Sequence, residues 1–591
     1  MPVPDGPFLC ETGDEMRKLA KYLKPYWVQC TLGPFCKLME AVLELILPTI
    51  MAYMINDGVV HRDLQTVLWL SVLMLIMVFA GFGFSMVCQY NAALASQGFG
   101  TDMRNRMFQH IQRFSYQDID HFTTTSLINR IGNDVNQLQV AVAMLIRLVI
   151  RAPFIIIGAI IMAMILDFRL SLVLAAAVPF IALILYGFIR LSTPLYRIYQ
   201  KKLDQFATVL QDQFAGIRVI RAFVTQRRER LKAEEHIDAL QLQMMRITRL
   251  SALLNPLTAI VINGAIVILL YQGVLQIQAG TIEPGVIVAF INYAGSILTA
   301  LVAMSNLIVI FTRAAASAQR VNEILEYAPS MSPGTEALQY LDPEEAIRFT
   351  HVTFSYGGGA AAIRDADFVI RRGEMIGIIG GTGAGKSTLI HLLNRFYDPQ
   401  EGSIEVFGQK VQSIRPQELH RCIATVPQLN ELFHGTVREN VCFGMRRASD
   451  EKVWEALRLA QAEDFVRALP RQLDEVIERG GANLSGGQRQ RLCIARALIR
   501  MPQILILDDS SSALDFRTDA ALRQCLREAF PQTTKIIVSQ RAGTLSTCDR
   551  ILVMQDGICA GFAPHAQLYE ECAVYRSICQ TQGVSRKAVR T

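Results

Sequence analysis

Two stretches in the carboxy-terminal half have the residue types and the spacing of a nucleoside-triphosphate site. The first lies between a strand-like apolar run and a helical one, and it consists of Gly380-Gly381-Thr382-Gly383-Ala384-Gly385-Lys386-Ser387-Thr388. In a strand–loop–helix setting, this G-x-x-x-x-G-K-S sequence predicts a loop whose backbone amides cradle phosphates. We expect Lys386 to bridge the β- and γ-phosphates and Ser387 to hold Mg²⁺. ATP and Mg²⁺ are therefore the predicted ligands.

The second stretch begins with four large apolar residues, Ile504 to Leu507, and continues with two carboxylates. Such a run is typical of a parallel strand that is buried on both faces. An aspartate at the carboxyl end of this strand, Asp508, is expected on the magnesium side of the nucleotide. Asp509 follows at the position where an ATPase needs a base for the attacking water. Whether so short a side chain can act as that base is open.

Two further features could contact nucleotide. Tyr356 precedes a glycine turn and could stack on adenine, or it could be a core residue. A serine and two glycines open a predicted helix and form a second anion-binding helix start; the residues are Ser485, Gly486, Gly487 and Gln488. Two phosphate-binding helix starts in one domain need not serve the same nucleotide.

The composition indicates a membrane domain joined to a soluble one. The chain has 591 residues, of which 51% are hydrophobic, and a mean hydropathy of +0.28. That is too long for one core and too apolar for an ordinary soluble protein. The net charge is +6, but the basic residues form no dense run, which argues against binding of nucleic acid. The positive-inside effect, which places basic residues in the cytosolic loops of membrane proteins, explains them better. Twelve cysteines without a C-x-x-C pair indicate reduced thiols.

Six apolar segments approach or exceed the ~20 residues that cross a bilayer. They are Tyr26 to Met54, Leu64 to Tyr90, Leu145 to Leu166, Leu170 to Ile189, Leu253 to Ile277 and Pro284 to Phe311. The connections after the second and fourth segments are long, helical and basic, which predicts that they and both termini lie in the cytosol. The N-terminus has no pattern of a cleaved signal peptide, so the first span is expected to direct insertion.

We therefore predict a membrane α-helical bundle of six transmembrane helices with long cytosolic extensions, followed by an α/β P-loop nucleotide-binding domain. The expected domains are an N-terminal segment with an amphipathic helix (1–25), the transmembrane domain (26–320), a Pro/Ser/Gly-rich linker (321–344) and the nucleotide-binding domain (345–591).

Three ionisable residues fall on one face of the first span: Lys37, Glu40 and Glu44. Charges in a span are costly and should face a bundle interior or a wet cavity. One interpretation is a carboxylate pair, Glu40 and Glu44, lining a cavity for cationic cargo. The other is an internal Lys37–Glu40 pair with structural partners such as Arg147 or Arg151.

With these motifs in place, nearly the whole chain resembles a half-size ATP-binding-cassette (ABC) exporter of the multidrug type. Leu484 to Gln488 matches the family signature, and Gln428 matches the glutamine that meets magnesium and the attacking water. Ser512-Ala513-Leu514-Asp515 matches the loop that acts across the dimer. Gly216 to Phe223 and the stretch around Tyr116 to Arg130 resemble the coupling regions at the stalk tips. The resemblance implies two chains that clamp two ATP molecules between one chain's phosphate loop and the other's signature.

Two positions depart from the family pattern. The family has glutamate where this chain has Asp509, and a switch histidine where it has Gln540. One explanation is a slow homodimer. The other is a heterodimer in which this chain carries a degenerate site of Asp509, Gln540 and Gln428, while a second half-transporter supplies intact glutamate and histidine.

The resemblance implies ATP-driven export of small lipophilic or drug-like compounds across the cytoplasmic (inner) membrane, with the nucleotide-binding domain in the cytosol. The expected partners are a second half-transporter, the lipid bilayer and small-molecule cargo, without nucleic acid. The alternatives are a homodimeric lipid or peptide translocase and a nucleotide-gated membrane regulator that does not transport.

Overall fold

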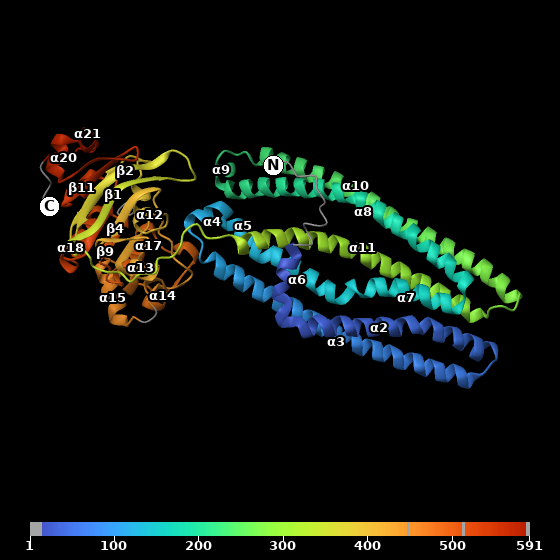
Figure 1. Cartoon of the computed structure of the whole chain (residues 1–591). Helices are drawn as coiled ribbons and strands as arrows, with labels where there is room; N and C mark the ends of the chain where they lie inside the picture. Colours follow the sequence, from blue (N-terminus) through green and yellow to red (C-terminus); the bar gives the residue numbers. More distant parts are fainter. Residues whose placement is uncertain (1–14, 446–447, 511–513, 587–591) are drawn as a thin grey trace. The chain divides into compact units, whose positions relative to one another are not determined.

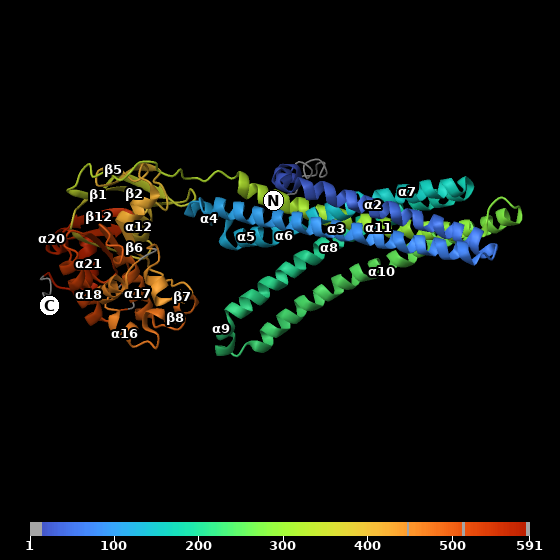
Figure 2. The ribbon, with the colours of Figure 1, turned by 90° about the horizontal axis from the view of Figure 1, so that it is seen from below.

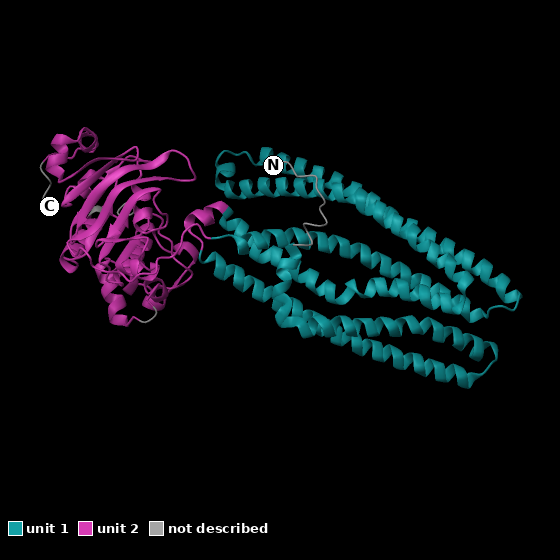
Figure 3. Ribbon diagram, in the orientation of Figure 1, with its two compact units in different colours: residues 1–113, 122–328 teal, residues 114–121, 329–591 magenta. Residues whose placement is uncertain are grey.

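The computed structural model describes residues 15–445, 448–510 and 514–586, and it divides into two compact units. One unit comprises residues 1–113 and 122–328, and the other comprises 114–121 and 329–591 (Figure 3). Most of the N-terminal segment expected at 1–25, and Ser512 and Ala513 of the expected dimer loop, lie outside the described residues.

The first unit is helical. Its described elements are η1 (Lys21–Tyr26), α2 (Trp27–Tyr53), η2 (Met54–Val60), α3 (Leu64–Ile111), α5 (Thr124–Asn129), η3 (Arg130–Asp134), α6 (Val135–Met144), η4 (Leu145–Val149), α7 (Arg151–Leu166), α8 (Phe168–Ala215), α9 (Ile217–Ala222), α10 (Gln226–Gln278) and α11 (Pro284–Glu326). Across the described ranges, six helical stretches are long and apolar enough to cross a membrane. The predicted six-helix bundle is confirmed.

Polar caps end the short turns between spans. Asp63 accepts hydrogen bonds from the backbone N–H groups of Gln65 and Thr66 at the start of α3, and Asp167 accepts one from Leu170 at the start of α8. The helices then continue well beyond bilayer length, since α8 has 48 residues and α10 has 53. Both views show α8 and α10 running side by side, with α9 joining their tips (Figures 1 and 2).

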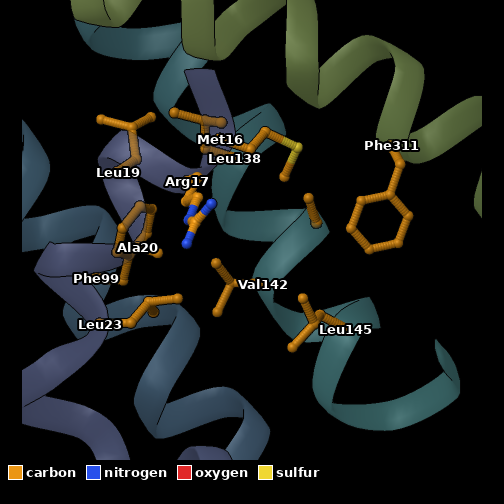
Figure 4. A pocket seen from close by; sticks show the side chains of 11 residues that line it. Met16, Arg17, Leu19, Ala20, Leu23, Phe99, Leu138, Val142, Leu145 and Phe311 are labelled. Carbon is orange, nitrogen blue, oxygen red and sulfur yellow. The ribbon is translucent and has the colours of Figure 1, made fainter. Parts of the chain in front are cut away.

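The helical segment before the first span covers an apolar cavity. Residues 15–20 are α-helical, and Leu19 on this segment is buried. The cavity beneath has a volume of about 240 Å³ and receives Phe99 from α3, Leu138 and Val142 from α6 and Phe311 from α11 (Figure 4). The expected amphipathic helix therefore packs its apolar side on this unit.

The second unit contains α4 (Tyr116–Phe122, of which 116–121 belong to this unit) and three sheets. One sheet has the order β2-β1-β4-β5 and is antiparallel: β1 (Glu345–Ser355), β2 (Ala361–Arg371), β4 (Glu401–Val406) and β5 (Gln409–Lys410). The six-stranded sheet has the order β12-β11-β3-β10-β9-β6: β3 (Met375–Gly380), β6 (Ile423–Val426), β9 (Ile504–Asp508), β10 (Thr534–Val538), β11 (Arg550–Gln555) and β12 (Ile558–Ala563). A short pair joins β7 (Gly435–Thr436) to β8 (Val476–Ile477).

Helices flank the sheets. They are α12 (Lys386–Leu393), α13 (Pro416–Cys422), α14 (Val437–Val441), α15 (Asp450–Leu459), α16 (Glu463–Arg467), α17 (Gly486–Leu498), α18 (Phe516–Ala529), α19 (Ala542–Leu545), α20 (His565–Glu571) and α21 (Ala573–Thr581), with the short turns η5 (Gln472–Asp474) and η6 (Arg479–Gly481). Along β9, Leu505 and Leu507 join one apolar cluster while Ile504 and Ile506 join another. The strand is therefore covered on both faces, as its unbroken apolar run predicts.

Candidate functional site

The carboxyl ends of four parallel strands meet at one edge of the six-stranded sheet. Val538 of β10 pairs in register with Ile378 of β3 and with Asp508 of β9, and Val426 of β6 pairs with Leu507. The segments that follow these strands therefore emerge together. They line one cavity of about 120 Å³, formed by Thr382, Gly383, Lys386, Ser387, Gln428, Asp508, Asp509, Val538, Ser539 and Gln540.

The phosphate loop has the backbone shape that the glycines allow. Gly383 and Gly385 have φ angles of +81° and +97°, in the left-handed region that side chains rarely adopt. A Cβ atom on Gly385 would lie 2.7 Å from the carbonyl oxygen of Ala362, so this position accepts only glycine. Immediately afterwards α12 begins at Lys386, which directs the N-terminus of that helix toward the loop. The cradle fits a phosphate chain.

Lys386 lies over its own loop. Its Nζ donates to the carbonyl oxygens of Gly380 at 2.9 Å and Gly381 at 2.7 Å. Burial lowers the pKa of Lys386, while the carboxylates of Asp508 and Asp509 oppose that effect. A partly buried cation next to the cradle suits a polyphosphate, whose charge stabilises the protonated amine.

The acidic end of β9 supplies oxygen ligands of the kind that Mg²⁺ prefers. Asp508 is buried, and it lines the same cavity as Ser387. Burial and the neighbouring charge of Asp509 raise the pKa of Asp508, against the opposing effect of Lys386. Since Ser387, Gln428 and Asp508 line the same cavity, the donor set fits Mg²⁺ held jointly with nucleotide phosphates.

Asp509 is tied to the neighbouring strand. Its backbone has a φ angle of +47°, and its N–H donates to the carbonyl oxygen of Val538 at 3.0 Å. Burial raises the pKa of Asp509, while Lys386 and Arg541 oppose that effect. Aspartate tolerates the left-handed region better than most residues. The carboxylate thus starts from a fixed backbone position.

Tyr356 lies beside α12 and is not among the residues lining this cavity. Its hydroxyl donates to Thr388 Oγ1 at 3.4 Å and lies 3.3 Å from Nδ1 of His391. The residue is 42% exposed, so it does not sit in the core. That exposure is compatible with adenine stacking, which stays a prediction.

The signature residues form the start of α17. Ser485 Oγ accepts a hydrogen bond from the N–H of Gln488 at 3.3 Å, and the Gln488 side chain accepts one from the N–H of Ser485 at 2.8 Å. This capping box fixes the helix start and leaves the adjacent glycine amides as anion donors. None of Ser485, Gly486, Gly487 and Gln488 lines the phosphate-loop cavity, and their contact with a second nucleotide stays a prediction.

Asp515 caps the next helix. It accepts hydrogen bonds from the backbone N–H and the hydroxyl of Thr518, both at 2.9 Å. The backbone hydrogen bond from Thr518 is the main reason that the pKa of Asp515 is lowered. The expected dimer-loop residue therefore has a structural role at the start of α18.

The sequence did not predict the aromatic contacts of α4. The rings of Tyr116 and Phe396 stack at 4.5 Å between centroids, and the hydroxyl of Tyr397 donates to Asp120 Oδ2 at 2.9 Å. The sequence marked Tyr116 through its resemblance to a coupling region but not its aromatic counterparts. The sequence feature that could have indicated these contacts is the Phe396-Tyr397 pair, which follows the helix after the phosphate loop.

A polar cavity lies among the membrane helices. Arg151 Nη2 is 2.6 Å from Glu44 Oε2, and both residues line a cavity of about 370 Å³ with Asn292, Ser296 and Thr299 of α11. Glu40 is not one of its lining residues and instead pairs with Lys37 at 2.6 Å. Both carboxylates thus have a cation partner, as in the second interpretation of the sequence.

Residues 30–302 match the family described as "ABC transporter transmembrane region", and residues 363–512 match the family described as "ABC transporter". "Uncharacterized ABC transporter ATP-binding protein YfiB" of Bacillus subtilis (strain 168) is 35% identical over 571 residues, covering 96% of this chain and 98% of the relative. An "ATP-dependent lipid A-core flippase" of Syntrophus aciditrophicus (strain SB) is 27% identical, covering 96% and 94%.

A solved structure shares the fold. It is titled "Structure of a bacterial Atm1-family ABC exporter with ATP bound", and the match has a TM-score of 0.79 at 21% identity, covering 96% of this chain and 99% of that chain.

Proposed function

This chain belongs to the ABC transporter family, and we propose that it is one half of a heterodimeric exporter whose own ATP site is degenerate. As an ABC exporter it couples ATP to membrane transport, and exporters of this kind act as dimers in a lipid bilayer. The unequal sites, the second chain and the cargo are the parts that we propose.

The observation that carries the proposal is that Asp509 and Gln540 line the same cavity as Lys386 and Ser387. Aspartate is one methylene shorter than the family's glutamate, and a misplacement of about 1 Å can cost on the order of a hundredfold in rate. The hydrogen bond from Asp509 N–H to Val538 holds the backbone, so the chain cannot move forward to recover that length. Gln540 can donate a hydrogen bond but cannot become cationic.

The binding machinery around these two residues has its full chemistry. The phosphate loop has its glycines, its lysine and its serine, and Asp508 lines the same cavity as Ser387. ATP and Mg²⁺ are therefore expected to bind here while hydrolysis is slow. When bound, Mg²⁺ neutralises charge on the phosphates; Lys386 orients them, and Gln428 and Asp509 hold water near the terminal phosphate.

The complete signature supports a division of labour between two chains. Ser485, Gly486 and Gly487 keep the family residue types and stand on a capped helix start. We propose that they complete the hydrolytic site formed by the phosphate loop of a partner with intact glutamate and histidine. This chain then contributes to hydrolysis mainly through its signature.

The tip formed by α9 favours an assembly of two chains. Phe223 and Val224, which follow this helix, are 75% and 78% exposed, and Phe214 before it is 71% exposed. Apolar side chains gathered at the end of a long helical stalk are expected to contact protein. This tip is therefore a candidate contact for the second chain.

For the cargo we propose small lipophilic compounds, exported across the cytoplasmic membrane with both termini in the cytosol. Relatives named as lipid A-core flippases favour a second candidate, a homodimeric lipid translocase. Both candidates move an apolar molecule, and they differ in whether this chain alone turns over ATP.

ATPase measurements in proteoliposomes test the proposal. The chain alone should hydrolyse ATP slowly, and activity should rise when a second half-transporter is co-expressed. A Glu→Gln change after the partner's magnesium-side aspartate should abolish that activity, and Gly486→Asp in this chain should abolish it as well, because it blocks the signature contact. Asp509→Asn should change the rate of the pair by less than about twofold. Full activity of this chain by itself would support the homodimer instead.

A further inference from the structure

Five ionisable side chains gather where α2 faces α7 and the turn before it, and their charges do not cancel. Lys37 pairs with Glu40, and Arg151 pairs with Glu44. Within residues 15–445, no hydrogen bond or ion pair reaches the fifth side chain, Arg147. Three cations face two carboxylates, which leaves one positive charge inside a candidate membrane-spanning stretch.

Each of the two arginines also has an unsatisfied hydrogen-bond donor. The Nε atoms of both Arg147 and Arg151 are buried from solvent and have no hydrogen-bond partner in this part of the chain. A guanidinium is never deprotonated in proteins, so these groups cannot escape the cost of burial by losing charge. Buried donors without partners are uncommon and mark places where another acceptor is to be expected.

The two arginines belong to one site by their spacing. They lie four residues apart, Arg147 in the π-helical segment η4 and Arg151 at the start of α7, and residues about one helical turn apart are neighbours on one face. Arg147, Lys37 and Glu40 all lie within electrostatic range of Cys88 on α3. Arg151 and Glu44 are further along the same helices and line the cavity of about 370 Å³. Arg147 itself does not line this cavity, and it lies about one helical turn before Arg151, which does.

The cavity wall has an amphipathic character. Glu44, Arg151, Asn292, Ser296 and Thr299 give it polar groups, and Ile155 and Ile291 give it apolar ones. The amide of Asn292 already donates to the carbonyl oxygen of Val288 at 2.8 Å, and the hydroxyl of Thr299 donates to that of Gly295 at 2.9 Å. The arginines are therefore the strongest remaining donors near this space.

We propose that this site binds the anionic headgroup of an amphipathic cargo, with a phosphate as the chemistry that fits best. A guanidinium presents paired donors that match two phosphate oxygens. An anion would satisfy Arg147 and the free Nε of Arg151, and the alkyl part of the ligand would contact the isoleucines. A cationic cargo would have to compete with Lys37 and Arg151 for carboxylates that are already paired at 2.6 Å.

This inference names the cargo class for the proposed exporter and rests on that proposed function. The same phosphate chemistry could come from a transported amphiphile or from a bilayer phospholipid that stays in place. Binding is therefore measured apart from ATP hydrolysis, so that failure of the heterodimer proposal and failure of this inference give different results.

The experiment uses full-length protein, co-expressed with its partner where one is required, in nanodiscs of phosphatidylcholine. Dodecyl phosphate and dodecyltrimethylammonium are compared as ligands that share a tail and differ in charge, with binding followed by native mass spectrometry and by thermal shift. We expect dodecyl phosphate to bind at least about tenfold more tightly than the cation, because a charge-assisted hydrogen bond is worth at least that ratio. Arg147→Gln should weaken dodecyl phosphate binding by about tenfold, and Arg147→Lys should restore part of it.

Two controls separate binding from folding. Arg169→Gln removes the same charge from an exposed position at the start of α8 and should leave dodecyl phosphate binding unchanged. The double variant Glu44→Gln with Arg151→Gln removes an ion pair without leaving a lone charge, and it should also weaken binding of the phosphate. Equal affinity for the anion and the cation, or an unaltered phosphate affinity in both Arg147→Gln and the double variant, would overturn the proposal.

A further arm identifies the source of the phosphate. If a resident phospholipid fills the site, adding phosphatidylglycerol to the nanodiscs should displace dodecyl phosphate from the parent protein but not change the residual binding of Arg147→Gln. If cargo fills it, vesicles should accumulate a fluorescent alkyl phosphate in an ATP-dependent manner, and Arg147→Gln should reduce this accumulation. Either source upholds the anion site, and loss of heterodimer-dependent ATPase with intact phosphate binding would overturn only the proposed function.

Discussion

Asp508 on β9 and Val538 on β10 are direct register partners in a parallel pair. The residues that follow them leave the sheet together, and the N–H of Asp509 donates to the carbonyl oxygen of Val538. Asp509 and Gln540 are the two departures from the family pattern. Both therefore follow the paired carboxyl ends of neighbouring strands, and both line one cavity. These two residues are 31 positions apart in the chain, and under the proposed function both would face one terminal phosphate.

Restoring the family residues at positions 509 and 540 should raise the rate of ATP hydrolysis. We expect Asp509→Glu combined with Gln540→His to increase the ATPase rate of the site by on the order of tenfold to a hundredfold, because the carboxylate gains about 1 Å of reach. Single-turnover hydrolysis and nucleotide trapping measure this change. Because Asp509 has a φ angle of +47°, which glutamate tolerates less well, the melting temperature should be followed in parallel. Unaltered turnover in a folded double variant would contradict the degenerate site.

Loss of the phosphate-loop lysine should remove binding as well as hydrolysis. Lys386 is the cation nearest the loop carbonyls, so Lys386→Met should weaken ATP binding by at least about tenfold, the equivalent of one charge-assisted hydrogen bond. Equilibrium binding of a fluorescent ATP analogue measures the affinity. Lys410→Met, at an exposed position of strand β5, is the matched control and should bind ATP normally.

Acidification should weaken magnesium-dependent ATP binding, and it should do so at a higher pH than the pH at which an ordinary aspartate takes up a proton. The pKa of Asp508 is raised, chiefly by burial and then by Asp509, so the carboxyl takes up a proton above its usual value of 3.8. A protonated carboxyl is a poor ligand for Mg²⁺. As the pH is lowered, the ATP affinity measured with Mg²⁺ should therefore begin to fall at a higher pH than the affinity measured with EDTA. Asp508→Asn should remove this difference. Because the folded pKa is the higher one, the same proton favours the folded state as pH falls.

The aromatic and polar contacts of α4 should couple the nucleotide unit to the membrane helices. Tyr397→Phe keeps the ring and deletes the hydrogen bond to Asp120, and Tyr116→Leu deletes the stack on Phe396. A hydrogen bond to a carboxylate is worth about 1.5–3 kcal/mol. We expect both variants to retain ATP binding and to lose stimulation of the ATPase by cargo. Equal cargo stimulation in both variants and the parent would contradict this coupling role.

A buried carboxylate in the first unit should matter more for stability than an exposed one nearby. Asp134 is 5% exposed and accepts hydrogen bonds from Ser317 Oγ at 3.0 Å and Arg320 Nε at 2.8 Å. We expect Asp134→Ala to lower the free energy of unfolding by about 3 kcal/mol, as for other buried pairs that lose one partner.

The neighbouring Arg130–Glu323 pair provides the comparison. The side chain of Glu323 is 51% exposed, so Glu323→Ala should cost less than about 1 kcal/mol. Thermal unfolding in detergent, at one protein and detergent concentration, compares the two variants. Similar melting temperatures for both would show that burial of Asp134 has no energetic consequence.

The sequence by itself predicted the features that depend on local spacing. The glycines in the run Gly380 to Thr388 permit the left-handed φ angles that Gly383 and Gly385 adopt in the loop. The apolar run at Ile504 to Leu507 predicted a strand covered on both faces, and six apolar stretches predicted the membrane helices. These features follow from backbone sterics and from the cost of exposing apolar surface, which act over a few residues.

Only the tertiary structure decided which distant side chains meet. The order β3-β10-β9-β6 brings Gln540 and Asp509 to one cavity, and no local pattern specifies that order. In the membrane unit the sequence left open whether Glu44 faces cargo or a cation, and the packing of α2 against α7 paired it with Arg151. Helix and strand periodicity determine which face of an element is buried, but the partner of a buried charge depends on how elements far apart in the chain pack together.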